Sequence, residues 1–410
     1  MEAIENTFAD IDKQMEKKEF SFKILSVCFG LKFRKDWYHN PVRPKGECGM
    51  NILILSGKFG MGHWIAAESL RQQLLRGFPE AAVEVMDFPA YAMPKLSQAM
   101  YKGFNLMVFH GSSIFNTYYK FTSLSHSDAR PIMEGTFFNR LSELLEEKSP
   151  DVVLATHPLC AQLISRFKEK TGTTLPLITC ITDVTAHPEW INKNTDCYLA
   201  PSGEIRQRLA EKGVNPNLVC VTGIPVREEF RQLSRDNTKK GKELLIMGGG
   251  LGLLPKDAQF YETLNAIPDV HTTIITGHNK KLFERLYGRW EHIQVIGYAD
   301  RVWDYMAKAD LIVTKPGGIT LFEAIFARVP VFAWQPVLLQ EKNNARWMKE
   351  KGIGWVAEHT NCAEEIRELI LDENRLLSAV AQEEGMQKQM DSAMLNRLVG
   401  ALVGKMEAAA

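Results

Sequence analysis

The chain has 410 residues, of which 45% are hydrophobic and 24% charged, and its formal net charge at pH 7 is zero. This length exceeds one ordinary core and predicts two domains of about 200 residues each. The equal numbers of basic and acidic residues argue against a nucleic-acid-binding protein. Seven scattered cysteines, never in CxxC spacing, predict a reducing compartment and no zinc site. Without an apolar span or a signal-like N-terminus, the sequence predicts a cytoplasmic protein.

The first 47 residues are expected to form a separate leader. Between Lys17 and Lys45, eight basic residues alternate with phenylalanines and aliphatic residues. A basic, apolar segment of this kind can lie on an anionic membrane surface. The alternative is a strand or arm that packs on the body of the protein with a solvated polar face, and the segment alone slightly favours this alternative.

The first domain is expected to span residues 48–235. It opens with the apolar run 50–56, a glycine-rich turn at 57–63 and a stretch with apolar residues near helical spacing. Further apolar runs alternate with helix-like stretches, which predicts a parallel sheet with right-handed crossovers. These runs are 81–88, 150–158, 175–183, 196–202 and 217–225.

The pattern restarts after the polar stretch 227–242, which we interpret as a linker. The second domain is expected to cover 236–385, and a C-terminal helix within 386–410 to return to the first domain. The predicted strands are 243–250, 272–278, 292–298, 310–318 and 329–334. Ligands bind beyond the carboxyl ends of such strands, so the site is expected in a cleft between the domains.

The segment 88–130 interrupts this alternation. It is dense in aromatic residues and methionine, with basic residues among them. Such a composition suits a membrane interface or a groove for a lipid acceptor. Ordinary helices packed on the sheet, with methionine filling gaps, explain it equally well.

Two glycine turns are candidate anion sites. The first, 57–63, contains Gly60 and Gly62 and ends in His63, and the second contains Gly248, Gly249 and Gly250. Glycines allow a ligand to approach the backbone amides at a helix N-terminus. His63 is placed to accept a proton from an acceptor hydroxyl, or is simply bonded to backbone. Neither turn matches a dinucleotide or P-loop motif.

The stretch 310–354 carries the most specific pattern. A strand closes at 314–318, and the helix expected after it would point its N-terminus at the cleft, which suits a diphosphate. Glu323, about one turn into that helix, can accept both hydroxyls of a ribose. Gln340 and Glu341 follow the next strand and can bond the hydroxyls of a sugar.

This stretch resembles the C-terminal domain of GT-B glycosyltransferases of family 28, in particular monogalactosyldiacylglycerol synthase and the processive diacylglycerol glucosyltransferases. The resemblance rests on T-K-P-G-G-x-T-L-x-E-A at 314–324 and P-V-x-x-Q-E-K-x-N-A at 336–345. The glycine turns, T-D-x-x-x-H-P-x-W at 182–190 and G-I-P-V-R at 223–227 support it. It implies an α/β protein of the GT-B fold, with two Rossmann-like doubly wound domains facing a cleft.

The resemblance also implies residue roles. Asp183 joins His63 as a candidate base, Glu323 would hold the ribose of UDP, and Gln340 and Glu341 would bind the donor sugar. The other implied donor-binding residues are Gly248 to Gly250 and Gly317, Gly318 and Ile319 at the diphosphate, and Arg227, Tyr298 and Ala299 around the uracil. The family inverts the anomeric centre without a metal or other cofactor, because helix N-termini stabilise the leaving UDP.

The predicted function is therefore transfer of a hexose from a UDP-sugar to a lipid hydroxyl, with diacylglycerol as acceptor and the inner face of an anionic membrane as the place of action. A non-lipid acceptor, a non-catalytic UDP-sugar sensor and a sugar-nucleotide 2-epimerase are the alternatives. One departure stands out, since Leu338 and Leu339 occupy the positions of the family's Pro-Gly. They would narrow the sugar pocket or change the geometry of its loop.

Overall fold

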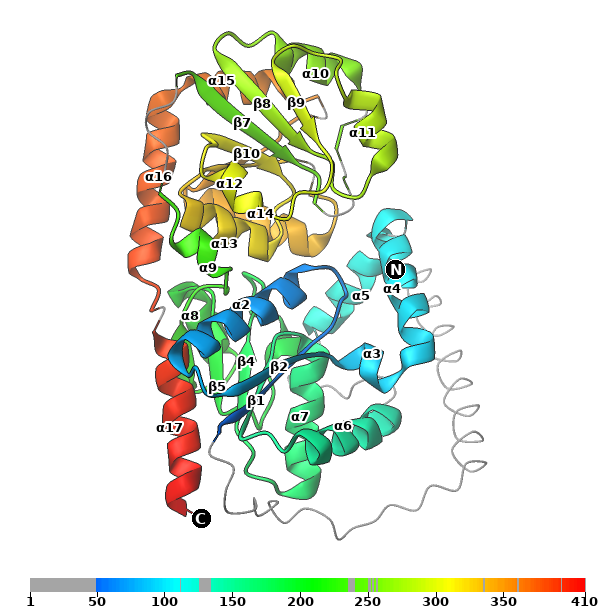
Figure 1. Ribbon diagram of the computed structural model, residues 1–410, viewed down its shortest axis with the longest axis vertical. Helices are drawn as coiled ribbons and strands as arrows, with labels where there is room; N and C mark the ends of the chain where they lie inside the picture. Colours follow the sequence, from blue (N-terminus) through cyan, green and yellow to red (C-terminus); the bar gives the residue numbers. More distant parts are fainter. Residues whose placement is uncertain are drawn as a thin grey trace, which may run out of the picture. The chain divides into compact units, whose positions relative to one another are not determined.

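The structure is a computed structural model, and it describes residues 49–110, 112–124, 134–234, 240–249, 252, 254–255, 257–334, 336–359, 361–391 and 393–409. The predicted leader 1–47 lies outside the described residues, as does Gly250. The described chain forms two parallel sheets with flanking helices (Figure 1).

The first sheet has six parallel strands in the order β2-β1-β3-β4-β5-β6. Its strands are β1 (Asn51–Ser56), β2 (Ala82–Asp87), β3 (Val152–Ala155), β4 (Leu177–Cys180), β5 (Cys197–Ala200) and β6 (Val219–Val221). Each lies within a run predicted from the sequence. The reason is that central parallel strands are covered on both faces, so β3, β4 and β5 are buried throughout.

The second sheet also has six parallel strands, in the order β12-β11-β10-β7-β8-β9. Its strands are β7 (Lys242–Met247), β8 (Val270–Ile275), β9 (Ile293–Ile296), β10 (Leu311–Thr314), β11 (Val331–Ala333) and β12 (Gly354–Val356). Strand β12 was not predicted, because it has three residues and no apolar run longer than Trp355-Val356. The doubly wound architecture itself is as predicted.

Helices cover both sheets. In the first domain they are α2 (Gly62–Gly77), α3 (Phe88–Ala92), α4 (Pro94–His110), α5 (Ser112–Leu124), α6 (Glu134–Lys148), α7 (Pro158–Thr171), α8 (Gly203–Glu211) and the short 3₁₀ helices η1 (Pro188–Trp190) and η2 (Pro216–Leu218). In the second they are α10 (Ala258–Asn265), α11 (Lys280–Leu286), α12 (Val302–Met306), α13 (Gly318–Ala327), α14 (Leu339–Glu350), α15 (Ala363–Leu371) and α16 (Glu373–Lys388).

The segment after β6 is more ordered than a linker. It forms α9 (Glu228–Arg231), whose Phe230 is fully buried in the core of the second domain. The predicted linker between the domains therefore begins with a short helix that buries one side chain. A single buried phenylalanine within a charged stretch does not stand out in the sequence.

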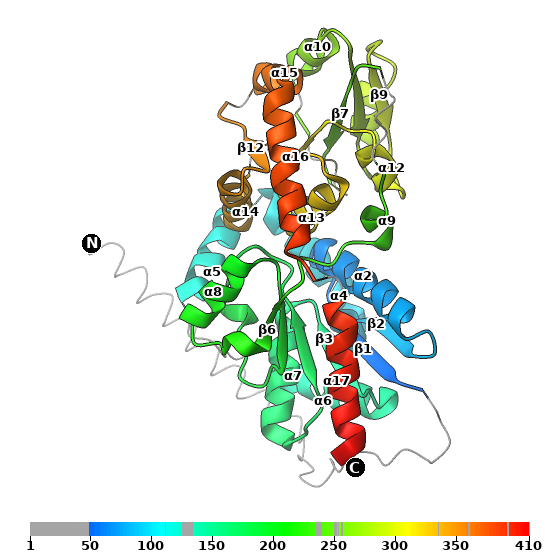
Figure 2. The same ribbon diagram turned by 90° about the vertical axis from the view of Figure 1, so that its left-hand side faces the viewer.

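The C-terminal helices connect the second domain back to the first. Helix α16 runs along the second domain and α17 (Met394–Ala409) along the first (Figure 2). Leu395, Val399 and Val403 of α17 are buried in one cluster with Ile52 and Ile54 of β1. None of the described helices is both long enough and apolar enough to cross a membrane.

The segment 88–130 folds into α3, α4 and α5, with residues 111 and 125–130 not described. Phe88 and Met93 are buried against the domain, whereas Leu96, Leu106 and Phe121 expose 48%, 62% and 69% of their surface. The packing interpretation is therefore confirmed for part of this segment, and the membrane or lipid-groove interpretation stays a prediction. The segment packs on the sheet and also presents apolar side chains to solvent.

Candidate active site

The glycine turns lie where each sheet reverses its strand order. In the first sheet β1 lies between β2 and β3, and in the second β7 lies between β8 and β10. The loops after β1, β7 and β10 contain the turns at 57–62, 248–249 and 315–318. Loops that leave such a switch point in opposite directions open a crevice that can take a ligand.

The two domains meet closely at the N-terminus of α13. A Cβ on Gly318 would lie 2.5 Å from the carbonyl oxygen of Thr182, so only glycine allows this approach. The position of a Cβ on Gly62, at the start of α2, is 3.9 Å from the Ile319 side chain. These contacts bring the first glycine turn, the loop after β4 and the first turn of α13 together.

His63 is oriented by the first domain. Its Nδ1 lies 2.9 Å from the Thr156 carbonyl oxygen and 2.7 Å from the Thr182 hydroxyl oxygen. A carbonyl oxygen only accepts, so Nδ1 carries the hydrogen and Nε2 keeps its lone pair. Burial lowers the pKa of His63 to about 4, against the opposing effect of the Thr156 carbonyl. The imidazole is therefore neutral at neutral pH.

Asp183, in the loop after β4, is a buried carboxylate with a free oxygen. The residue is 3% exposed, and Oδ1 has no hydrogen-bond partner among the residues described. Oδ2 accepts from the Thr185 hydroxyl at 3.1 Å. Burial raises the pKa of Asp183 to about 7, although hydrogen bonds from Thr185, the Val184 amide and the Gln340 side chain oppose the rise. The carboxylate is thus poised to exchange a proton near neutral pH.

Gln340 and Glu341 occupy the first turn of α14 but are used differently. The Gln340 side chain is close enough to Asp183 of the first domain to lower the pKa of its carboxyl. The Glu341 carboxylate accepts from the backbone amides of Val337 and Leu338 at 2.9 and 3.2 Å, and lies 3.4 Å from Lys315 Nζ. Glu341 therefore caps its own helix, and Gln340 is the freer of the two for a ligand.

Glu323 and Arg227 form a second buried centre. Glu323 on α13 is 6% exposed, and its Oε1 lies 3.6 Å from Arg227 Nη2 without a hydrogen-bond partner in the described chain. Burial raises the pKa of Glu323 to about 7, and the guanidinium of Arg227 opposes this rise. Arg227 also stacks over Trp303, with its guanidinium carbon 4.7 Å from the ring centroid. The arrangement leaves a carboxylate oxygen available to ligand hydroxyls.

The remaining predicted residues lie in the loops that follow β1, β7, β9 and β10, beyond the carboxyl ends of these strands. Tyr298 is 56% exposed and stacks on His278 with ring centroids 4.3 Å apart, whereas Ala299 packs against the core. Gly60 and Gly249 have φ of 78° and 67°, and no atom would lie within 4 Å of a Cβ on either. Gly248 follows β7 directly, and Gly317 is the N-cap of α13. The first amides of this helix have no acceptor within it and remain open to a ligand.

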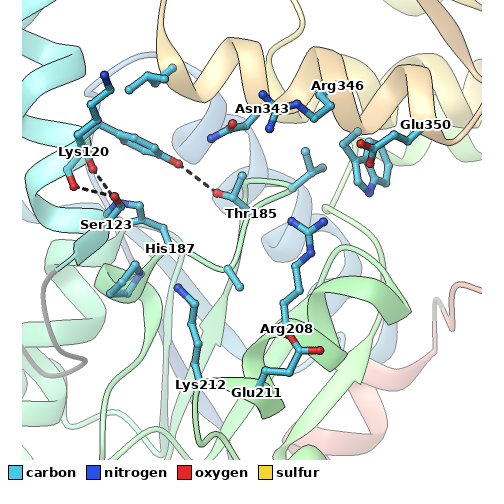
Figure 3. A pocket seen from close by; sticks show the side chains of 16 residues that line it. Lys120, Ser123, Thr185, His187, Arg208, Glu211, Lys212, Asn343, Arg346 and Glu350 are labelled. Atoms are coloured by element: carbon cyan, nitrogen blue, oxygen red, sulfur yellow. Dashed lines mark hydrogen bonds between the residues drawn. The ribbon is translucent and has the colours of Figure 1, made fainter.

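A cavity of about 470 Å³ lies beside the Asp183 loop, between the two domains (Figure 3). Basic side chains from α5, α14 and the α8 region surround it, and Thr185 and His187 also contribute to its wall. The basic residues are Lys120, Arg208, Lys212 and Arg346, with Glu211 and Glu350 among them. Within the described chain, its lining includes none of the residues predicted to bind the donor or to act as base.

Sequence reasoning missed the polar contacts that α5 makes across the crevice. Asn116 and Tyr119 reach the loop before α14, the Asp183 loop and α14 itself. Their only sequence signal was membership of the aromatic segment 88–130. Among the described residues, no group of three or more His, Cys, Asp or Glu is placed to hold a metal ion.

Comparison with known proteins places this geometry in a family. The sequence model described as monogalactosyldiacylglycerol (MGDG) synthase matches residues 63–226, and the glycosyltransferase family 28 C-terminal domain matches residues 244–396. Processive diacylglycerol beta-glucosyltransferases are similar over most of their length. That of Bacillus licheniformis is 30% identical over 80% of this chain and 88% of its own, and that of Bacillus subtilis is 29% identical over 79% and 88%.

Solved structures show the same fold at low sequence identity. The glycotransferase of kitacinnamycin superposes with a TM-score of 0.58 at 15% identity, covering 87% of this chain and all of its own. MurG of Acinetobacter baumannii gives 0.56 at 12% identity, covering 86% and 99%. The fold is thus that of GT-B glycosyltransferases. The chain belongs to glycosyltransferase family 28, among the relatives that carry the MGDG synthase type of N-terminal domain.

Proposed function

We propose that the protein transfers a hexose from a UDP-sugar to the free hydroxyl of diacylglycerol, with inversion at the anomeric carbon. One observation carries the proposal: the buried Asp183 carboxylate has an oxygen without a hydrogen-bond partner among the described residues, and the Gln340 side chain is close enough to lower the pKa of that carboxyl. A proton acceptor of the first domain is thereby next to a side chain suited to a sugar hydroxyl. Glucose is the first candidate, because the similar full-length proteins are named glucosyltransferases.

The donor would bind along α13 and the second glycine turn. Glu323 Oε1 would accept from the ribose hydroxyls, and Tyr298 and Arg227 would border the uracil. The amides at Gly318 and Ile319 would hold the diphosphate, because a helix N-terminus attracts negative charge. The same amides would stabilise the charge that develops on the leaving UDP, which needs no metal ion.

Asp183 is the better candidate for the base. A general base works best when its pKa lies near the operating pH, and the pKa of Asp183 is raised to about 7. The pKa of His63 is lowered to about 4, which makes Nε2 a weak acceptor. The two assignments differ in the pH profile of kcat/KM, which falls below about pH 7 if Asp183 is the base and only below about pH 4 if His63 is.

The acceptor would reach this base from α4 and α5. A row of half-buried aromatic rings leads from the first glycine turn to α5, with neighbouring centroids 4.9 to 6.3 Å apart; it consists of Phe59, Tyr101, Phe104, Phe115 and Tyr119. Leu96, Leu106 and Phe121 on the same helices are exposed beside the exposed Lys95, Lys102 and Lys120. Apolar side chains flanked by lysines suit the surface of an anionic membrane.

The test is release of UDP from mixed UDP-sugars by the purified protein, with and without vesicles that contain diacylglycerol. We expect release to require diacylglycerol and to yield a glycolipid whose sugar identifies the donor. Vesicles without diacylglycerol, at equal anionic lipid content, are the control. UDP release that is equal with both vesicles would refute the lipid acceptor, and UDP-sugar binding without release would refute the transferase.

A further inference from the structure

Helix α5 contacts both halves of the proposed site. Asn116 and Tyr119 lie one turn apart on this helix. Asn116 Oδ1 accepts from the Leu339 amide at 2.7 Å, and its Nδ2 donates to the Val337 carbonyl oxygen at 3.3 Å. One side chain of the first domain thus holds both sides of the loop that begins α14.

Tyr119 contacts the Asp183 loop and α14 together. Its hydroxyl lies 3.2 Å from that of Thr185, the contact drawn as the dashed line that ends on Thr185 in Figure 3. Thr185 in turn donates to Asp183 Oδ2 at 3.1 Å. A threonine hydroxyl has one hydrogen, and Thr185 gives it to Asp183, so Tyr119 must donate to Thr185. The Asn343 side chain of α14 lies close enough to the Tyr119 hydroxyl to oppose the rise of its pKa that burial causes.

We propose that Asn116 and Tyr119 are positioning residues, which fix the donor-sugar loop 337–341 and the Asp183 carboxylate relative to each other through helix α5. The inference rests on the proposed function, because it takes Asp183 as base and Gln340 as sugar ligand. Helix α5 also carries the exposed Phe121. Helix α5, which would face the lipid with one side, therefore fixes with its other side the position of the donor-sugar loop relative to Asp183.

The two side chains have separable effects. The chain Tyr119 to Thr185 to Asp183 favours the ionised carboxylate, because each donor strengthens the next. Loss of the Tyr119 hydroxyl should thus move the acidic limb of kcat/KM to higher pH. Among the described residues, Asn116 bonds only the backbone of the sugar loop, so its loss should raise KM for the UDP-sugar and leave the pH profile in place.

The other groups around Asp183 stay the same in these variants. His63 of α2 contacts the adjacent Thr182, and Gln340 of α14 is uncharged. His187, farther along the loop, stacks on Tyr119 with centroids 4.5 Å apart and has its Nδ1 3.5 Å from Glu189 Oε2. Tyr119→Phe keeps that ring contact and removes only the hydroxyl.

The experiment compares Tyr119→Phe and Asn116→Ala with Thr117→Ala, an exposed hydroxyl of the same helix that bonds Ser113 within α5. For Tyr119→Phe we expect the acidic limb of the pH profile of kcat/KM to lie about half a pH unit higher. For Asn116→Ala we expect a donor KM about tenfold higher. Thr117→Ala should match the parent protein. An unmoved limb in Tyr119→Phe together with an unchanged donor KM in Asn116→Ala overturns the inference.

The outcome does not depend on the identity of the acceptor. Titration of ¹³C-labelled aspartate by NMR reads Asp183 without substrate, with Asp183→Asn to assign the signal. A higher midpoint in Tyr119→Phe supports the inference, and an equal midpoint contradicts it. If the parent protein transfers sugar to a lipid but the variants have the same pH profile and donor KM as the parent, this inference fails and the proposed function stands. If it does not transfer sugar to any lipid, the proposed function fails and the titration still decides.

Discussion

Replacement of Asp183 by asparagine should stabilise the folded protein at alkaline pH while it abolishes transfer. The buried carboxylate has a pKa of about 7, against an ordinary value of 3.8. Between these values the unfolded chain loses a proton that the folded chain still holds, so the stability of the parent protein falls as pH rises. Above pH 7 the free energy of unfolding of the parent protein is lowered by the full cost of burying the ionised Asp183 carboxylate.

The size of the effect follows from the pKa. A rise of about three pH units corresponds to about 4 kcal/mol of destabilisation by the ionised carboxylate. The asparagine amide lowers the stability of the variant by about 1–3 kcal/mol if one of its buried polar groups finds no hydrogen-bond partner. The net gain for Asp183→Asn is therefore about 1–3 kcal/mol at pH 8. Near pH 4, where the parent carries a neutral carboxyl and only the amide penalty remains, the variant should instead be less stable than the parent by about 1–3 kcal/mol.

The assay is denaturant unfolding of both proteins at pH 8 and at the lowest pH at which the parent stays folded. Asp304→Asn, which removes a partly exposed carboxylate paired with Arg301, is the matched control. The difference in unfolding midpoint between Asp183→Asn and the parent should grow with pH and be flat for the control. A stability difference of the same sign and size at both pH values would refute the assignment of a buried, neutralised carboxylate at this position.

Two further changes test the donor side and the domain contact. Glu323→Gln should raise the Kd for UDP by about tenfold to a hundredfold in calorimetry, because an ionised acceptor for the ribose hydroxyls is lost; an unchanged Kd would exclude Glu323 from nucleotide binding. Gly318→Ala places a methyl group 2.5 Å from the Thr182 carbonyl oxygen. Because this pushes the two domains apart, kcat should fall by more than tenfold although UDP still binds. An unaltered kcat would show that catalysis does not require the close contact between Gly318 and Thr182.

Most strands of both sheets could be predicted because their sequences are short and mainly apolar. Strand β12 could not, since Gly354–Val356 offers three residues and takes its place only by pairing with β11. The glycine turns were found from their position after strands. Their convergence depends on Gly318 approaching Thr182, a contact between distant parts of the chain.

The roles of α5 show where sequence reasoning stops. Asn116 and Tyr119 sit in a segment that composition could assign equally to a membrane face or to packing. Their hydrogen bonds reach Leu339 and Thr185, far away in the sequence. No local pattern encodes such a pairing, and only the packing of α5 against the cleft creates it.

Leu338, which stands where the family has proline, adds a backbone hydrogen bond to Glu341. The Leu338 amide donates to Glu341 at 3.2 Å, a bond that proline cannot make, and Leu338 itself is 8% exposed. In this chain Glu341 is therefore held at the helix terminus by one more amide than a proline would allow. The φ of Leu338 is −76°, which proline can adopt.

The double variant Leu338→Pro with Leu339→Gly should consequently fold and release one bond on the Glu341 carboxylate. We expect KM for the donor, or the preference among UDP-sugars, to change severalfold, because Glu341 gains freedom to bond a sugar hydroxyl. Leu338→Ala, which keeps the amide and loses the buried side chain, is the control for packing. If both variants shift donor kinetics alike, the effect comes from the leucine side chain, and the argument from the amide is wrong.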